Sequence, residues 1–228
     1  NMWASETDMM IGYHAVPVIA DAILKGFSGI DPRKALDICV QTARKRDYRS
    51  IGTYIDTGYV PTGTDDMGGN DDWSMSRTLE YAYDDWCIAQ LAAFVGEEDI
   101  AREFYARSKN YENLFNTDTG FLEPRQADGS FITEFSPVAY GPHVCESNAW
   151  MYQWSVQHDI SGLCQLFGGK KKMAKMLNEF FTFTEEDASN RPLFSTGMIG
   201  QYAHGNEPSH HAAYLFNHVG QPSKCQEY

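Results

Sequence analysis

Residues 201–211 concentrate groups that can do chemistry: an amide, a carboxylate and three imidazoles lie around a glycine and a proline. Asn206 and Glu207 offer the oxygen ligands that a hard cation such as Ca²⁺ prefers. The imidazoles can donate hydrogen bonds to hydroxyl groups or bind a metal. They belong to His204, His210 and His211.

Two other interpretations of this segment remain open. It could be a polar loop that caps a following helix, with incidental histidines. A zinc site is less favoured, because the histidines lack the HExxH spacing that puts two ligands on one helical face. The density of polar groups favours a functional loop.

A second candidate is Glu146, which stands just before a predicted helix. Trp150 and Trp154 lie four residues apart on one face of that helix, and sugars stack on such aromatic surface. Partial desolvation beside it would raise the pKa of the carboxyl group and prepare a general acid. As an alternative, Glu146 is an ordinary first-turn acid that interacts with the helix dipole.

A third cluster lies on a helix predicted around residues 76–86, where three acids stand among aromatic residues. Glu80 and Asp84 are four residues apart and share a face, so together they could bind several sugar hydroxyls. A structural role is equally open, with Arg77 paired to Glu80 or Tyr81. His14, near the start of an earlier helix, is most simply a hydrogen-bonded core histidine.

Composition excludes several classes of protein. The 228 residues include 18 basic and 31 acidic side chains, a net charge of −13, and 43% are hydrophobic. We therefore expect a soluble globular protein without affinity for nucleic acid, which needs a basic face. No apolar run approaches the roughly 20 residues of a membrane span. Five cysteines without CxxC spacing predict buried free thiols.

Hydrophobic periodicity predicts an all-α protein built from about four helical hairpins with long loops between them. Pro17 would kink the first helix, and residues 58–72 and 116–143 read as long loops. The predicted helices cover Met9–Lys25, Asp31–Arg46, residues 74–94, Ile100–Phe115, Ser147–Val156, Lys170–Phe181, Pro208–Val219 and a last one that begins at Pro222.

Four segments in this order resemble glycoside hydrolase family ninety-two, a family of exo-acting α-mannosidases. They are residues 12–22, 78–86, 146–152 and 204–211, and the last, HGNEPSHH, is quite specific. The resemblance implies an (α/α)6 toroid, a bound Ca²⁺, and hydrolysis of terminal α-linked mannose, α-1,2-linked by expectation, with inversion. The implied partner is a mannose-terminated glycan, and the implied location is periplasmic or extracellular.

The resemblance also assigns roles residue by residue. Glu146 matches the general acid, although Ser147 stands where the family usually has glycine. Asn206 and Glu207 match the calcium-binding loop, and His204 matches a contact to the leaving sugar. The expected substrate-binding residues are His14, Glu80, Asp84, Trp150, His204 and His211.

The family's general base follows the His-His segment by several tens of residues, so we expect it beyond Tyr228. On this view residues 1–228 form part of the catalytic toroid, without its β-sandwich and its remaining helices, and are inactive alone. Two alternatives are a catalytically silent glycan-binding or scaffold fragment and an unrelated six-hairpin glycosidase.

Overall fold

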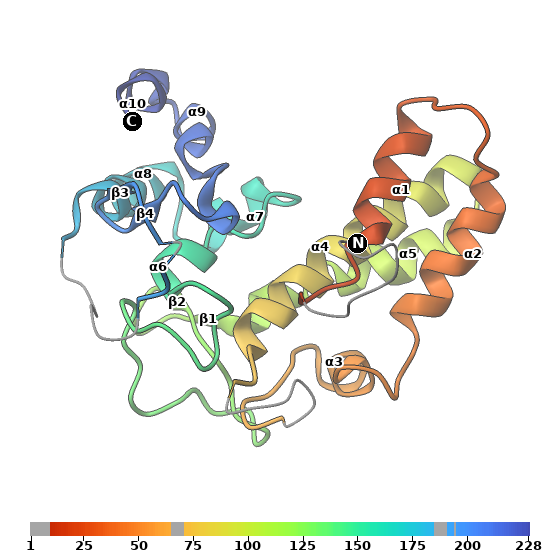
Figure 1. Ribbon diagram of the computed structural model, residues 1–228, viewed down its shortest axis with the longest axis horizontal. Coiled ribbons are helices and arrows are strands. Elements are labelled where there is room, and N and C mark those ends of the chain that lie inside the picture. The colour runs from red at the N-terminus through yellow and green to blue at the C-terminus, as the bar shows by residue number, and fades with distance from the viewer. Residues whose placement is uncertain (1–9, 65–70, 185–190, 194) are drawn as a thin grey trace.

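The structure, a computed structural model, describes residues 10–64, 71–184, 191–193 and 195–228. Helices dominate the described part, and its strands form two short antiparallel pairs, β1 with β2 and β3 with β4 (Figure 1). The α-helices are α1 (Ala15–Leu24), α2 (Pro32–Ala43), α3 (Ile51–Thr57), α4 (Ser74–Val95), α5 (Glu98–Arg107), α6 (Ala149–Tyr152), α7 (Ile160–Leu166), α8 (Lys170–Thr182), α9 (Leu215–His218) and α10 (Pro222–Glu227). The 3₁₀ helices are η1 (Asn110–Leu114), η2 (Glu207–Ser209) and η3 (Ala212–Tyr214), and the strands are β1 (Phe115–Asn116), β2 (Phe121–Leu122), β3 (Met198–Ile199) and β4 (Tyr202–Ala203).

Helix α4 is the central element of the fold. Its 22 residues are buried on nearly every side, and it packs against α1, α2 and α5. The buried side of its N-terminal half, with Met75 and Leu79, belongs to one hydrophobic core, and Ile88 and Leu91 belong to a second. The helix therefore connects the two bodies seen at the left and right of Figure 1.

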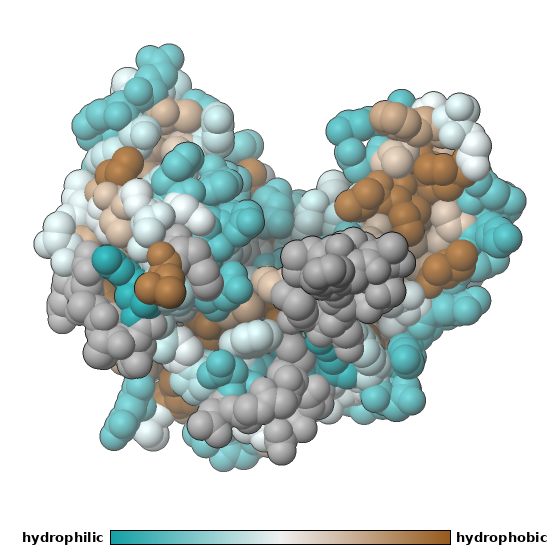
Figure 2. Space-filling model, in the orientation of Figure 1, coloured by the Kyte–Doolittle hydropathy of each residue, from teal (hydrophilic) through white to brown (hydrophobic). Residues whose placement is uncertain are grey.

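The two cores are built from different helices. The second core lies among α1, α2, α3 and α5, whereas the first lies among α6 to α9 and the segment around β1 and β2. Between the part that carries α1 and α2 and the part that carries α9 and α10, the surface is hollowed (Figure 2). Residues from both parts can therefore face a shared space.

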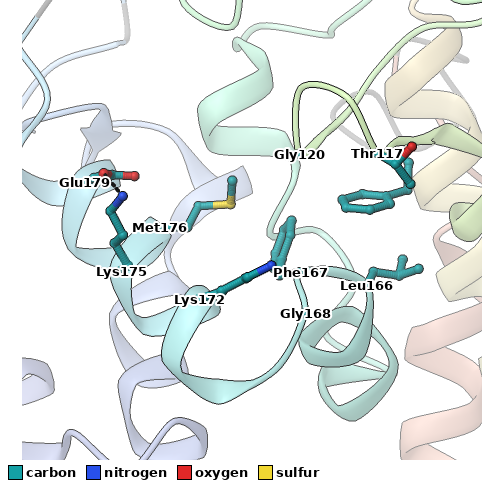
Figure 3. Close-up of a pocket in the computed structure, with 10 residues that line it drawn as sticks. Thr117, Gly120, Leu166, Phe167, Gly168, Lys172, Lys175, Met176 and Glu179 are labelled. Carbon is teal, nitrogen blue, oxygen red and sulfur yellow. Dashed lines mark ion pairs between the residues drawn. The ribbon is translucent and has the colours of Figure 1, made fainter.

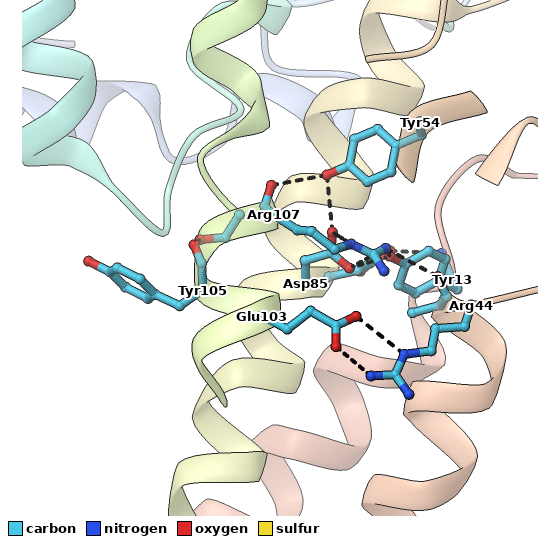
Figure 4. A network of polar contacts seen from close by, with 10 residues as sticks. Tyr13, Arg44, Tyr54, Asp85, Glu103, Tyr105 and Arg107 are labelled. Atoms are coloured by element: carbon cyan, nitrogen blue, oxygen red, sulfur yellow. Dashed lines mark hydrogen bonds and ion pairs between the residues drawn. The ribbon is translucent and has the colours of Figure 1, made fainter. Parts of the chain in front are cut away.

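A buried polar network holds the second core together (Figure 4). The Asp85 carboxylate accepts hydrogen bonds from Tyr13 Oη at 2.6 Å, Tyr54 Oη at 3.1 Å and Arg107 Nε at 2.9 Å. Arg107 also donates to the carbonyl of Ala43 at 3.1 Å. Because these residues come from α2 to α5 and the segment before α1, Asp85 and Arg107 together fix the relative positions of five chain segments.

Helix pairing agrees in part with the sequence prediction of helical hairpins. Contacts between successive α-helices join α1 with α2, α4 with α5, α7 with α8, α8 with α9, and α9 with α10. Between α4 and α5 the turn is made by Gly96, whose φ of 82° favours glycine. Cys39, Cys87 and Cys145 are buried free thiols as expected, and Cys164 and Cys225 are free and partly buried.

Several predicted helix boundaries are wrong. Helix α1 begins at Ala15 rather than Met9, because Gly12 takes a φ of 78°, and Pro17 therefore falls in the first turn, where no kink is required. The predicted helices at 147–156 and 208–219 are broken into shorter pieces, α6 in the first case and η2, η3 and α9 in the second.

Other errors concern residues 98–115 and two omitted helices. Helix α5 ends at Arg107, and η1 and β1 follow it where a continuous helix was predicted. Helices α3 and α7 lie in segments where none was predicted, and the second long loop contains a β-hairpin. None of the described helices is long and apolar enough to cross a membrane.

Candidate active site

A cavity of about 480 Å³ is lined by residues from four segments that are far apart in the sequence. These segments are the approach to α1, the middle of α4, the stretch around α6, and the loop that leads into η2. Six of the residues named above as catalytic, substrate-binding or metal-binding candidates line it: His14, Glu80, Glu146, Asn206, Glu207 and His211.

Glu146 and the Asn206 loop are joined directly. The Asn206 side-chain amide donates to the Glu146 carbonyl at 3.0 Å, and its Oδ1 accepts from the Glu207 N–H at 3.1 Å. Glu146 itself takes a left-handed φ of 54°, which is unusual for a residue with a side chain. The two segments are thus fixed against each other beside the cavity.

The surroundings of Glu146 favour its protonated form. Burial raises the pKa of its carboxyl group, the nearby charge of Glu207 raises it further, and a hydrogen bond from Asn206 opposes both effects. A carboxyl group with a raised pKa can donate a proton at neutral pH, which is the property required of a general acid.

Two carboxylates of α4 hold His14 between them. Its Nδ1 lies 2.8 Å from Asp84 Oδ1, and its Nε2 lies 3.3 Å from Glu80 Oε2. Because both ring nitrogens face carboxylate oxygens, both must carry protons to satisfy them. Burial opposes this charge, but the hydrogen bonds that His14 donates to Asp84 and Glu80 outweigh it and raise the pKa of His14 to about 10. The cavity is therefore lined by an imidazolium.

Glu80 is held from a second side as well. Tyr152 donates its hydroxyl proton to Glu80 Oε1 at 2.7 Å. Asp84 is completely buried, accepts from the Tyr13 N–H at 2.8 Å, and is not among the residues that line the cavity. Glu80 and Asp84 do share a face of α4, as predicted, but Asp84 positions His14 while Glu80 reaches the cavity. Arg77 donates to the backbone carbonyls of Asp72 and Arg49.

His211 is neutral. Its Nε2 donates to the Trp154 carbonyl at 2.6 Å, and burial lowers its pKa despite that hydrogen bond. Its Nδ1 consequently carries a lone pair and can accept a hydrogen bond. One charged histidine, His14, and one neutral histidine, His211, therefore line the same cavity.

Two further sequence candidates lie elsewhere. Trp150 is buried in the first core, where it packs edge-on against Phe121, and it does not line the cavity. His204 is exposed, shares a hydrogen bond of 2.8 Å with the Tyr202 hydroxyl, and lies with its ring centre 5.3 Å from that of His210. The predicted aromatic surface beside Glu146 is therefore not provided by Trp150 in this cavity.

A calcium ion needs more oxygen ligands than the sequence candidates supply. Asn206 Oδ1 and the Glu207 carboxylate have the right chemistry, yet Ca²⁺ takes about six to eight oxygens. Among residues 10–64, 71–184, 191–193 and 195–228, no group of three or more His, Cys, Asp or Glu could hold a metal ion. Asn206 and Glu207 thus fit as part of a coordination shell, which water and substrate hydroxyls would have to extend.

Sequence reasoning missed several lining residues. Tyr152, Ser155 and Gln157 also line the cavity. The sequence gives little indication of these residues. They reach the cavity because the helix that follows Asn148 ends after one turn and the chain then bends back. Asn148 caps this turn by accepting from the Met151 N–H at 3.1 Å.

A separate cavity of about 510 Å³ lies between the β1–β2 turn and the start of α8 (Figure 3). Phe115, Phe167 and Met176 make it largely apolar, and its carboxylate, Glu179, is 3.6 Å from the ammonium of Lys175. It shares no lining residue with the first cavity and lacks a pair of carboxylates that could do acid–base chemistry. The cavity beside Glu146 is therefore the candidate active site.

Comparison with known proteins identifies the family. Residues 1–228 match the model of the glycosyl hydrolase family 92 catalytic domain, and the chain belongs to that family. It is 30% identical, over 93% of its length and 30% of the relative's, to an uncharacterized secreted glycosidase of Arthroderma benhamiae.

Solved structures of Bacteroides thetaiotaomicron proteins are similar in fold and sequence. The family 92 α-mannosidase BT3965 shares 40% identity with a TM-score of 0.86 over 98% of this chain and 28% of its own. The same protein has also been solved with mannoimidazole, and that structure gives a TM-score of 0.88. The family 92 inverting mannosidase BT2199 shares 32% identity, with a TM-score of 0.83 over 98% of this chain and 32% of its own. The chain spans about a third or less of the length of each of these relatives.

Proposed function

We propose that the protein containing this chain is a calcium-dependent exo-α-mannosidase that removes terminal mannose, α-1,2-linked, from mannose-rich glycans with inversion. Membership of the family and the similarity to two mannosidases support this proposal. The single observation that carries it is the convergence of Glu146, His14, Glu80 and the Asn206 loop on one cavity.

Glu146 is the proposed general acid. Its proton passes to the glycosidic oxygen as the bond from that oxygen to the anomeric carbon breaks, so the leaving sugar departs as an alcohol. A water molecule attacks the opposite face of the ring and gives its proton to a second carboxylate. In inverting enzymes the two carboxyl groups lie about 6.5 to 9.5 Å apart. We assign the second carboxylate to a part of the protein outside residues 1–228.

The remaining lining residues would orient the mannose ring. The Glu80 carboxylate accepts hydrogen bonds from His14 and from the Tyr152 hydroxyl, and it has lone pairs left to accept from a sugar hydroxyl. His211 adds an acceptor. Because Tyr152 and Asp84 already hold Glu80 and His14, these groups are positioned before substrate arrives, which reduces the entropic cost of orientation.

Asn206 and Glu207 are the proposed calcium ligands from this chain, and the ion, when bound, would hold sugar hydroxyls. Calorimetric titration of the full-length protein with Ca²⁺ tests this assignment without an activity readout. Glu207→Gln should weaken calcium binding by about tenfold or more, since it removes a charged ligand. An unchanged calcium affinity would exclude Glu207 from the shell.

The proposal also includes the fold of the whole catalytic domain and the location of the protein. The contacts between successive α-helices support an (α/α)6 toroid to which this chain contributes several hairpins. Resemblance to a relative described as a secreted glycosidase supports export to the periplasm or cell exterior.

The decisive kinetic experiment replaces Glu146 in the full-length enzyme. Glu146→Gln should lower kcat/KM for α-1,2-mannobiose by about 10²- to 10⁴-fold, the usual contribution of general acid catalysis. It should affect α-mannosyl fluoride much less, because fluoride leaves without a proton donor. Glu98→Gln, which changes an exposed glutamate of α5, is the matched control. Equal loss on both substrates, or no loss, would remove Glu146 from this role.

A further inference from the structure

The apolar cavity between the β1–β2 turn and the start of α8 lies outside the candidate active site (Figure 3). Its volume of about 510 Å³ is typical of cavities that hold small molecules, which measure about 300 to 1,000 Å³. Such cavities are mostly apolar and carry a few polar groups that fix the orientation of a ligand. We name it the lysine-rimmed cavity, because Lys172 and Lys175 are among its lining residues.

Aromatic and aliphatic side chains form the apolar part of the lining. They are Phe115, Leu166, Phe167 and Met176. The rings of Phe115 and Phe167 meet edge to face with 5.9 Å between their centres, and Phe167 also packs edge-on against the buried Trp154. Phe167 is only 6% exposed and is held by the first core. This apolar wall therefore exists before a ligand arrives.

Lys172 brings a positive charge to the apolar wall. Its side chain passes over Gly168, where a Cβ atom would lie 2.9 Å from Lys172 Cδ and 3.1 Å from its Nζ. Gly168 has a φ of 83°, so both the backbone and the space taken by the lysine favour glycine there. Figure 3 shows the Lys172 side chain extended toward the Phe167 ring. The ammonium group is thus placed beside the aromatic part of the lining.

The two lysines of the cavity differ in their partners. Lys175 forms an ion pair with Glu179, with 3.6 Å between Nζ and Oε1 (Figure 3). No described carboxylate forms an ion pair with Lys172, although the chain has 31 acidic and 18 basic residues. Because Glu179 balances Lys175, the positive charge of Lys172 is not compensated within the lining.

The neighbours of Lys172 in the sequence strengthen this positive charge. Residues 170–175 contain four lysines and no acid, on a chain whose net charge is −13. Like charges gathered beside an apolar wall raise the local potential and attract anions. An anion bound in the cavity would also reduce the repulsion among these lysines. Charge and shape together therefore favour a ligand that is both apolar and negatively charged.

We propose that the lysine-rimmed cavity binds a small organic anion with an apolar body and one carboxylate group. The body would pack against the two phenylalanine rings and Met176, whose flexible thioether side chain adapts to ligands of different shape. The carboxylate would form a charged hydrogen bond with Lys172. This binding site is separate from the proposed mannosidase reaction, because the two cavities share no lining residue among those described.

The test is a calorimetric titration of the full-length protein with two ligands of similar shape. One is 4-phenylbutyrate, which has an apolar body and a carboxylate, and the other is 4-phenylbutan-1-ol, which has no charge. A dissociation constant on the order of 1 mM is expected for 4-phenylbutyrate, given its few atoms. The wild-type protein should bind it about threefold to tenfold more tightly than the alcohol, because only the carboxylate pairs with Lys172.

Four substitutions locate the binding site. Lys172→Gln should abolish the preference for the carboxylate. Lys171→Gln is the matched control, since it removes the same charge from the next residue, which does not line the cavity, and it should keep most of the preference. Leu166→Gln should weaken the binding of both ligands by about fivefold, because it removes apolar surface from the lining. Ile38→Gln, at an exposed apolar residue of α2, should weaken neither.

Three results would overturn the inference. The first is no measurable binding of 4-phenylbutyrate to the wild-type full-length protein at millimolar concentrations, which includes the case that another part of the protein covers the cavity. The second is equal affinity of the wild type for the two ligands, and the third is a preference that survives Lys172→Gln. A preference that is lost in Lys172→Gln and kept in Lys171→Gln supports the inference. None of these readouts depends on mannoside hydrolysis, so the proposed function stands or falls separately.

Discussion

At the scale of single residues, the site depends on how neighbouring charges set protonation. Glu146 is protonated more readily because it is desolvated and lies near Glu207, whereas His14 keeps its charge because two carboxylates surround it. His211, buried against a carbonyl, stays neutral. The cavity thus shifts the protonation of its three titratable side chains in different ways, as acid–base chemistry requires.

His14 makes the stability of the protein depend on pH in a defined window. Its folded-state pKa of about 10 lies above the unfolded value of about 6.5. Its contribution to stability is therefore complete below about pH 6.5 and is lost as the pH rises through about 10. Urea unfolding midpoints of wild type and His14→Asn should differ most at pH 6 and converge by pH 10. A difference that stays constant over this range would show that His14 is not held as an imidazolium. His218→Asn, which changes an exposed histidine, should show no such trend.

Glu207 should control the alkaline limb of the pH–rate profile. Its negative charge raises the pKa of Glu146, so Glu207→Gln should lower that pKa. The general acid would then lose its proton at lower pH, and the alkaline limb of kcat/KM would move toward acid. The profile is measured at saturating calcium to separate this effect from ion binding. An alkaline limb that stays in place, or moves the other way, would contradict the coupling.

At the scale of elements, hydrophobic periodicity predicted the long helices. It missed or misplaced most of the short ones. Helices α2, α4 and α8 lie close to their predicted bounds, since α2 and α8 each have an apolar stripe and α4 is a long, largely buried helix that ends at Gly96. Helices α6 and α9 are single turns, whose bounds are set by tertiary contacts and not by periodicity. Of the site, the types of the residues at Glu146 and Asn206 could be recognised in the sequence. Their hydrogen bond, and the burial of Trp150 away from the cavity, depend on how distant segments pack.

Two neighbouring residues of α5, one buried and one exposed, test how this helix packs. Phe104 is fully buried in the second core, whereas the next residue, Tyr105, is 52% exposed. Phe104→Ala should lower the free energy of unfolding by about 3–5 kcal/mol, because it leaves a cavity in a packed core. Tyr105→Ala should change it by less than about 0.5 kcal/mol, as is usual for surface positions. Chemical denaturation of both variants measures the difference, and equal effects would mean that α5 does not pack as described.

At the scale of the whole molecule, the site lies where two bodies meet. His14 and Glu80 come from the part built on α1 and α4, whereas Glu146 and Asn206 come from the part built on α6 to α9. Helix α4 contributes to both cores and so fixes the positions of the two sides of the cavity relative to each other. This arrangement explains why segments 190 residues apart in the chain can act on one ligand.

We propose that the cavity on which Glu146, His14 and the Asn206 loop converge binds the terminal sugar. A crystal structure of the full-length protein with mannoimidazole tests it most directly. The mannose-like ring should lie in this cavity, within hydrogen-bonding distance of Glu146 and Glu80. Mannoimidazole bound elsewhere, out of reach of both Glu146 and Asn206, would contradict it.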